Sequence, residues 1–282
     1  MSLVVRLVRE ADLAAADRVL CEAFARPASF LPHMRLHLQM EPRLFYVAED
    51  AGQIVGTVGA VDYGSIAYIG LMAVDPALQR RGIARRLIEP LLYELDARGC
   101  TRILLDATDQ GAPLYESLGF VDDGQARVFE LRTMTAGEAP ASSVEISPSA
   151  DLAELVAFDA ESFGASRAKL LAALWELYRD RVLVARDDAG KLQGYLFARD
   201  PTLGPWVVRS PAAAELLLAE ALRLPYLQTP HIMIPRSNQA AAELLSTHGF
   251  VEQRKLRHMR RGGHGSCGQP ENLYGQASFA HG

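Results

Sequence analysis

Cysteine and long apolar runs are scarce in this chain of 282 residues. Its three cysteines, Cys21, Cys100 and Cys267, are widely spaced, which excludes a disulfide framework and the paired spacing of a zinc site. No run of 18 apolar residues occurs, and charged residues at 6–12 interrupt the N-terminal segment. These absences exclude a membrane-spanning helix and a secretory signal, so we expect a cytoplasmic protein.

An excess of basic charge is also absent. The chain has 29 Lys and Arg against 34 Asp and Glu, a net charge of −5 and a pI near 5.8. A nucleic-acid-binding surface requires a basic face, so we expect no nucleic-acid partner. The 49% hydrophobic content is typical of globular proteins, and the length is enough for two domains.

Residues 68–98 are the most informative part of the sequence. Residues 68–74 are almost all apolar and predict a buried strand that ends at Asp75-Pro76. A basic loop with one glycine, Gly82, then opens a predicted helix, in which Pro90 should cause a kink or a division. The apolar stripe of this helix is Ile83, Leu87, Leu91 and Leu95.

A helix N-terminus behind a glycine and several arginines is a good seat for phosphate. Its first N–H groups have no partner within the helix, and the helix dipole is positive at this end. Neither a Walker loop nor a dinucleotide fingerprint occurs in this part of the chain. The pattern therefore predicts a phosphorylated cofactor of another kind.

The pattern V-x-x-x-x-Q-x-x-G-x-A, from Val74 to Ala84, resembles the acetyl-CoA pyrophosphate loop of the GNAT superfamily of N-acetyltransferases. The resemblance continues through Gly99, residues 103–107 and residues 114–120, where the family closes its site with a tyrosine-bearing helix. It implies acetyl-CoA as co-substrate and direct transfer of the acetyl group to an amine.

The resemblance also assigns site residues. Tyr115 stands where the family has its proton-donating tyrosine, and Gln79 would hold the turn. Thr108 occupies a place where the family usually has asparagine, which weakens one expected cofactor contact. The expected cofactor-binding residues are Met72, Ala73 and Val74 on the strand, Gln79, Arg80, Arg81, Gly82, Ile83, Ala84 and Arg85 in the loop and helix, and Thr108.

The proton acceptor for the amine stays open at this point. Candidates are Asp106 at a strand end, His33 and Glu116, and water relays the proton in many relatives of the family. His33 and His37 have the i, i+4 spacing of metal ligands, but no third ligand is nearby, so we expect no metal. Cys100 follows a helix-ending glycine, away from the loop, and is not expected to be a nucleophile.

Alternation and turn signals predict the other elements of the first half. The expected strands are 3–8, 44–49, 53–60, 102–107 and 127–131, and the expected helices are 11–24, 30–40 and 111–118. The small and polar residues 133–143 have the composition of a linker.

The second half repeats the first. The Gly-Phe pair at 119–120 recurs at 249–250, and a hairpin recurs across 188–190. Leu245 replaces Tyr115, and the loop is replaced by residues 209–213, a well-capped helix start without glycine. This half resembles a GNAT-like C-terminal domain found behind GNAT domains in bacterial and nematode acetyltransferases.

We therefore expect an α/β protein of two tandem GNAT-like domains, each a mixed, mostly antiparallel sheet flanked by helices. The predicted boundaries are 1–132 for the catalytic domain, 133–143 for the linker, 144–262 for the degenerate domain and 263–282 for a looser tail. The expected function is acetyl-CoA-dependent N-acetylation of a small-molecule or peptide amine, and a homodimer is compatible with it. The alternative is a catalytically idle acyl-CoA-binding sensor or scaffold.

Overall fold

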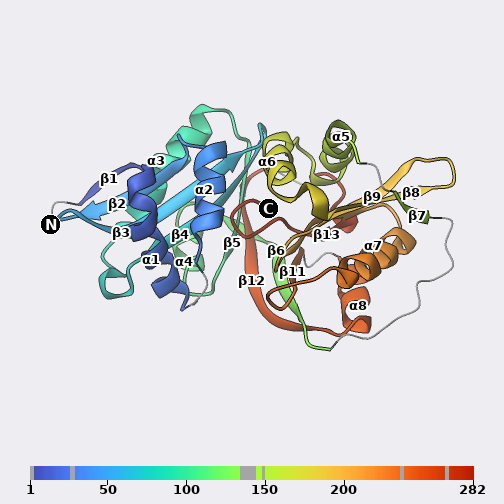
Figure 1. The fold of residues 1–282 in the computed structure, drawn as a ribbon. Coiled ribbons are helices and arrows are strands. Elements are labelled where there is room, and N and C mark those ends of the chain that lie inside the picture. Colours follow the sequence, from blue (N-terminus) through green and yellow to red (C-terminus); the bar gives the residue numbers. More distant parts are fainter. Residues whose placement is uncertain (1–2, 26–28, 134–143, 148–149, 236–237, 264–266) are drawn as a thin grey trace. The chain divides into compact units, whose positions relative to one another are not determined.

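A computed structural model describes residues 3–25, 29–133, 144–147, 150–235, 238–263 and 267–282 (Figure 1). The chain forms two compact units. The first contains Met1–Val121, Met259–Gly263 and Phe279–His281, and the second contains most of the remainder. The predicted linker at 133–143 lies outside the described residues, except for Thr133.

The first unit is a sheet with helices on both faces. Its strands β1 to β5 are adjacent in chain order, followed by the end of β12, and all the pairs from β1 to β4 are antiparallel, whereas β4 and β5 are parallel. The strands are β1 (Val4–Leu7), β2 (Phe45–Asp50), β3 (Gln53–Asp62), β4 (Ile66–Val74) and β5 (Arg102–Ala107). The helices are α1 (Leu13–Phe24), α2 (Leu31–Met40), α3 (Ile83–Ala97) and α4 (Ala112–Glu116).

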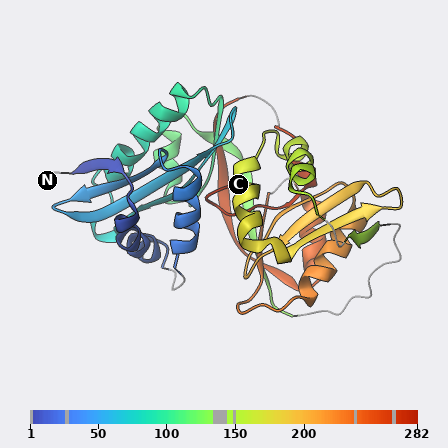
Figure 2. The ribbon, with the colours of Figure 1, turned by 45° about the horizontal axis from the view of Figure 1, so that its top comes forward.

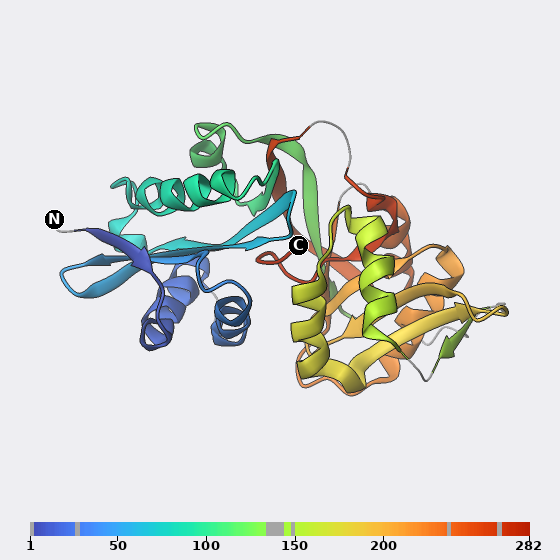
Figure 3. The same cartoon turned by 90° about the horizontal axis from the view of Figure 1, so that it is seen from above.

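Each face of this sheet has its own apolar core. Helices α3 and α4 cover one face, with Ile83, Leu87 and Tyr115 in the core, and α1 and α2 cover the other (Figure 3). The predicted apolar stripe of α3 is fully buried, whereas Pro90 lies inside a single helix and does not divide it. The expected strands and helices of the first half are present.

The second unit contains a five-stranded sheet in the order β13-β10-β9-β8-β7. It also contains most of β12, β6 and β11, which are neighbours in that order in the other sheet. Helix α7 covers one face of the five-stranded sheet, and α5 and α6 lie on the other (Figure 2). The strands are β6 (Val121–Leu131), β7 (Val144–Ser147), β8 (Val182–Asp187), β9 (Leu192–Ala198), β10 (Leu203–Val208), β11 (His231–Pro235), β12 (Phe250–Gly262) and β13 (Leu273–Gly275). The helices are α5 (Leu152–Phe163), α6 (Ala168–Tyr178), α7 (Pro211–Arg223) and α8 (Gln239–Thr247). The architecture confirms the predicted fold class, and no helix in the described ranges is both long and apolar enough to cross a membrane.

The compact units differ from the predicted domain boundaries. Strand β6 lies almost wholly in the second unit, although it was expected to close the first domain. The last residues of β12, in contrast, belong to the first unit, where Arg261 pairs with Asp96 at 2.8 Å and Gly262 packs against Thr101. The physical reason is strand pairing, because β12 is the hydrogen-bonded neighbour of β5.

The prediction of a looser tail was wrong for residues 267–282. Strand β13 pairs with β10, and the Asn238 side chain donates hydrogen bonds to the main-chain oxygens of Glu271 and Leu273 at 2.8 and 3.0 Å. Several following residues are buried: Gln276, Ala277, Ser278, Ala280 and His281. The small side chains that suggested looseness instead permit close packing, since a Cβ on Gly204 would lie only 2.3 Å from the Gln276 oxygen.

Candidate active site

Strand β4 contains a bulge at the position where the sequence predicts contact with the cofactor. Its register with β3 shifts between the pairs Gly59–Gly70 and Thr57–Ala73, and Leu71 has a positive φ of 53°. A bulge inserts an unpaired residue and redirects the strand. Here it changes the direction of Met72, Ala73 and Val74.

Beyond the bulge, β4 and β5 no longer pair. Their parallel ladder includes Ile66–Ile69 with Arg102–Leu105 and ends there, although β4 continues to Val74 and β5 to Ala107. The two strands therefore form a fork, with main-chain N–H and C=O groups of β4 outside the β4–β5 ladder. This is the splayed arrangement that the resemblance implies, and such groups can pair with an extended ligand arm.

The loop after β4 turns sharply into α3. The Asp75 side chain accepts a hydrogen bond from the Ala77 amide at 2.9 Å, and Arg80 and Gly82 have positive φ values of 62° and 77°. Gly82 immediately precedes α3, and a Cβ there would meet no atom within 4 Å. The glycine is required for backbone conformation, and the space beside it is open to a ligand.

Gln79 holds this loop to the strand and to the next turn. Its Nε2 donates to the Val74 oxygen at 3.2 Å, and its Oε1 accepts from Gln110 Nε2 at 3.0 Å. The side chain therefore fixes the loop from both ends. These two hydrogen bonds give the Gln79 side chain a positional role in the loop.

Positive charge surrounds the N-terminus of α3. Arg80 and Arg81 are exposed, and in the described ranges neither forms an ion pair. Arg85, in contrast, donates to Ser117 Oγ at 2.6 Å and lies 3.5 Å from Glu89, which ties α3 to the turn after α4. Two unpaired guanidinium groups beside four helix N–H groups suit a diphosphate.

Tyr115 lies in α4 with its ring in the core shared with α3. The side chain is 7% exposed, and its ring packs edge-on against Phe120 with centroids 5.8 Å apart. Burial raises the pKa of the Tyr115 phenol above its ordinary value of 10. The hydroxyl therefore keeps its proton at neutral pH.

Thr108 caps the turn that leads to Tyr115. Its Oγ1 accepts a hydrogen bond from the Gly111 amide at 3.2 Å. A Cβ on Gly111 would lie 3.6 Å from the Tyr115 ring, so this turn sits directly on the tyrosine. The threonine thus positions α4, which is a role the sequence did not suggest.

The candidate proton acceptors occupy different places. Asp106 lies on β5 just past the last ladder pair and accepts a hydrogen bond from the Tyr68 hydroxyl. His33 lies on α2, with its ring 6.5 Å from that of His281, and Glu116 is exposed on α4. The sequence did not identify Tyr68 or His281 as part of the site. Tyr68 lies beside Asp106 and His281 beside His33 only because segments far apart in the chain pack together.

His37 packs between two aromatic side chains. Its ring is fully buried, stacks on His281 at 5.6 Å and contacts Phe45 at 5.0 Å. Burial lowers the pKa of His37 to about 4. Within the described part of the chain no group of three His, Cys, Asp or Glu side chains could hold a metal ion.

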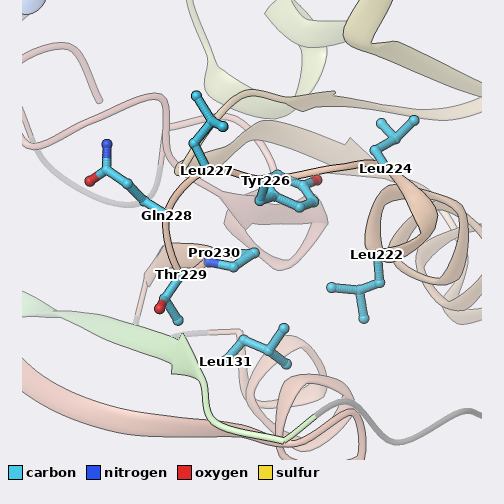
Figure 4. A pocket seen from close by; sticks show the side chains of 8 residues that line it. All are labelled: Leu131, Leu222, Leu224, Tyr226, Leu227, Gln228, Thr229 and Pro230. Atoms are coloured by element: carbon cyan, nitrogen blue, oxygen red, sulfur yellow. The ribbon is translucent and has the colours of Figure 1, made fainter.

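In the second unit the helix equivalent to α3 is α7, and the residues at its N-terminus differ from those at the N-terminus of α3. Ser210 caps α7 by accepting from the Ala213 amide at 3.2 Å, which confirms the predicted helix start. Arg209 is paired with Glu161, and Leu245 is fully buried where the first unit has Tyr115. A hollow of about 400 Å³ elsewhere in this unit is lined by uncharged residues (Figure 4). It is lined by Leu131, Leu222, Leu224, Tyr226, Leu227, Gln228, Thr229 and Pro230.

Comparison with known families gives matches to two families, at residues 41–122 and 155–275, and both families are described as "Acetyltransferase (GNAT) domain". Together they cover more than half of the chain. The uncharacterized N-acetyltransferase YitH of Bacillus subtilis is 31% identical over 159 residues, which are 56% of this chain and 55% of the relative. Acetyltransferase plu1384 of Photorhabdus laumondii is 42% identical over 97 residues, 32% of this chain and 66% of the relative. The chain thus spans about half the length of the first relative and about two thirds of the second.

Solved structures are similar over both units. A candidate acetyltransferase from Pyrococcus horikoshii has a TM-score of 0.86 and 26% identity, and the match covers 100% of this chain and 96% of that one. A GCN5-related N-acetyltransferase from Sphaerobacter thermophilus has a TM-score of 0.68 at 14% identity, covering 94% and 98%. The second likeness concerns the fold alone.

Proposed function

Because the chain belongs to the GNAT superfamily of acetyltransferases, we propose that its first unit transfers the acetyl group of acetyl-CoA directly to a primary amine of a small molecule or a peptide. One observation supports this above all others. The fork between β4 and β5, the open loop at Gly82 and the Tyr115 side chain all occur in one unit around α3.

The proposed binding roles follow from the chemistry of each group. The N–H groups from Arg80 to Arg85 receive the pyrophosphate, with Gly82 allowing close approach and Arg80 and Arg81 supplying charge. The main chain of 72–74 pairs with the pantetheine arm and polarises the thioester carbonyl. Tyr115 donates its proton to the departing sulfur.

Direct transfer is preferred to an acyl-enzyme. Cys100 is buried, and desolvation with the neighbouring Asp62 carboxylate raises the pKa of its thiol to about 12. A thiol that holds its proton so firmly is a poor nucleophile at neutral pH. The amine itself is therefore the nucleophile in the proposed reaction.

The test is release of free thiol from acetyl-CoA in the presence of a panel of amines: n-hexylamine, glucosamine, spermidine and a short lysine-containing peptide. We expect thiol release that depends on at least one of these amines and yields its N-acetyl derivative. Acetyl-CoA binding without turnover of any amine would instead favour the idle acyl-CoA-binding module.

A further inference from the structure

Two glycines on adjacent strands form a flat area on the α2 face of the first unit. Gly59 of β3 and Gly70 of β4 are direct cross-strand partners. A Cβ on Gly59 would lie 2.6 Å from His37 Nε2, and a Cβ on Gly70 would lie 2.3 Å from the Ala280 Cα. The space that a side chain would occupy at each glycine is thus filled, at Gly59 by α2 and at Gly70 by the segment 279–281.

Segment 279–281 is firmly seated in the first unit. Its His281 ring stacks on His37 with an interplanar angle of 17°, and the Tyr63 hydroxyl donates to the His281 oxygen at 2.8 Å. Ala280 is 5% exposed and packs in the core that contains Leu71 and Ala73. The segment therefore lies against β4 immediately before the bulge that leads to the proposed thioester position.

A carboxylate lies on the same face. Tyr68 precedes Gly70 by two residues on β4, so their side-chain directions coincide, and its hydroxyl donates to Asp106. Tyr68 is almost fully buried, whereas Asp106 is partly exposed. Because the β4–β5 ladder ends at Ile69 and Leu105, Asp106 lies at the opening of the fork.

We propose that this corner of the first unit is the seat of the acceptor amine, with Asp106 receiving the amino group, Tyr68 positioning the carboxylate, and segment 279–281 forming the wall beside them. The inference rests on the proposed function and deepens it. The site suits a cationic primary amine, because its accessible charged group is a carboxylate next to an aromatic and imidazole wall.

The chemical step balances with groups already named. The bound ammonium first loses one proton to bulk water. The lone pair of the resulting neutral amine then forms the new C–N bond, and the C–S bond breaks with its electron pair leaving on sulfur. The sulfur takes the proton of Tyr115, and the nitrogen gives one proton to Asp106. Both side chains return to their starting states by exchange with water.

Asp106→Asn removes the proton acceptor and the charge while preserving shape. We expect kcat for the best amine of the panel to fall about 100-fold. We also expect binding of that amine to the CoA-bound protein, measured by calorimetry, to weaken at least 10-fold, whereas affinity for acetyl-CoA stays unchanged. Asp106→Glu should recover part of the lost rate, and Tyr68→Phe should lower kcat by a smaller factor.

Gly70→Ala tests the wall, because its Cβ would displace segment 279–281. We expect the KM for the amine to rise at least 10-fold with the KM for acetyl-CoA unchanged. Gly194→Ala is the matched control: it is a strand glycine of the second unit whose Cβ would lie 2.5 Å from Val208, so it should cost stability without changing either KM.

The outcomes separate the two proposals. If no amine is turned over but amine binding still requires Asp106, the proposed function fails and the seat stands. If Asp106→Asn binds and acetylates amines like the unmodified protein, or if no panel amine binds at all, the seat is overturned. If Gly70→Ala changes only stability, as the control does, segment 279–281 is not a wall of the site.

Discussion

Gly82→Asp is expected to abolish the stabilisation of this protein by acetyl-CoA. At 100 times Kd, a ligand that binds only the folded state adds about 2.7 kcal/mol to the free energy of unfolding. The variant places a carboxylate where the pyrophosphate would bind and forces a non-glycine residue to adopt φ of 77°. Thermal unfolding with and without acetyl-CoA measures the effect.

Gly52→Asp provides a matched control for this experiment. Gly52 lies in the β2–β3 turn and has φ of 80°, and a Cβ there, as at Gly82, would meet no atom within 4 Å. The backbone strain and added charge are therefore the same, but the site is not touched. We expect the full ligand-induced shift in this variant, and an equal shift in Gly82→Asp would disprove the role of the loop.

Tyr115→Phe is expected to lower kcat by about 100-fold or more with acetyl-CoA affinity nearly unchanged. The change removes one oxygen and leaves the ring packed against Phe120, so only proton donation is lost. Single-turnover kinetics with the best panel amine, together with calorimetry for acetyl-CoA, separate the rate from the affinity.

Tyr46→Phe controls for loss of a tyrosine hydroxyl in the same unit. Tyr46 is partly buried against the same core as Tyr115, and burial also raises the pKa of its phenol. We expect its kcat to match that of the unmodified protein. An unchanged kcat in Tyr115→Phe would show that this tyrosine is a packing residue.

The parts of the site that the sequence predicts are those formed by residues that are consecutive in the chain. The apolar run of β4, the Gly82 loop and the stripe of α3 are consecutive, so periodicity and turn chemistry suffice to place them. Even there, the strand bulge at Leu71 depends on the register with β3, which no local pattern contains.

The parts that the sequence misses depend on pairing between distant segments. The end of β12 joins β5, and Ala280 fills the space above Gly70, more than 200 residues away. The only sequence signal for the packing of Ala280 was the pair of glycines at 59 and 70. These two residues can be seen to lie side by side only once the register of β3 and β4 is known. Composition alone made residues 263–282 resemble a tail.

The two units also differ in what they can bind. In the first, Arg80 and Arg81 are free of ion pairs within the described ranges and Gly82 leaves open space. In the second, the one arginine before α7 is already paired with Glu161, and no glycine permits close approach. The dipole of α7 alone provides only about half a positive charge, which holds a diphosphate weakly.

Calorimetric titration of the full chain with acetyl-CoA tests the central claim most directly. We expect one acetyl-CoA per chain in the unmodified protein, with binding lost in Gly82→Asp and retained in Gly52→Asp. Two equivalent sites, or a single site that survives Gly82→Asp, would contradict the assignment of cofactor binding to the first unit alone.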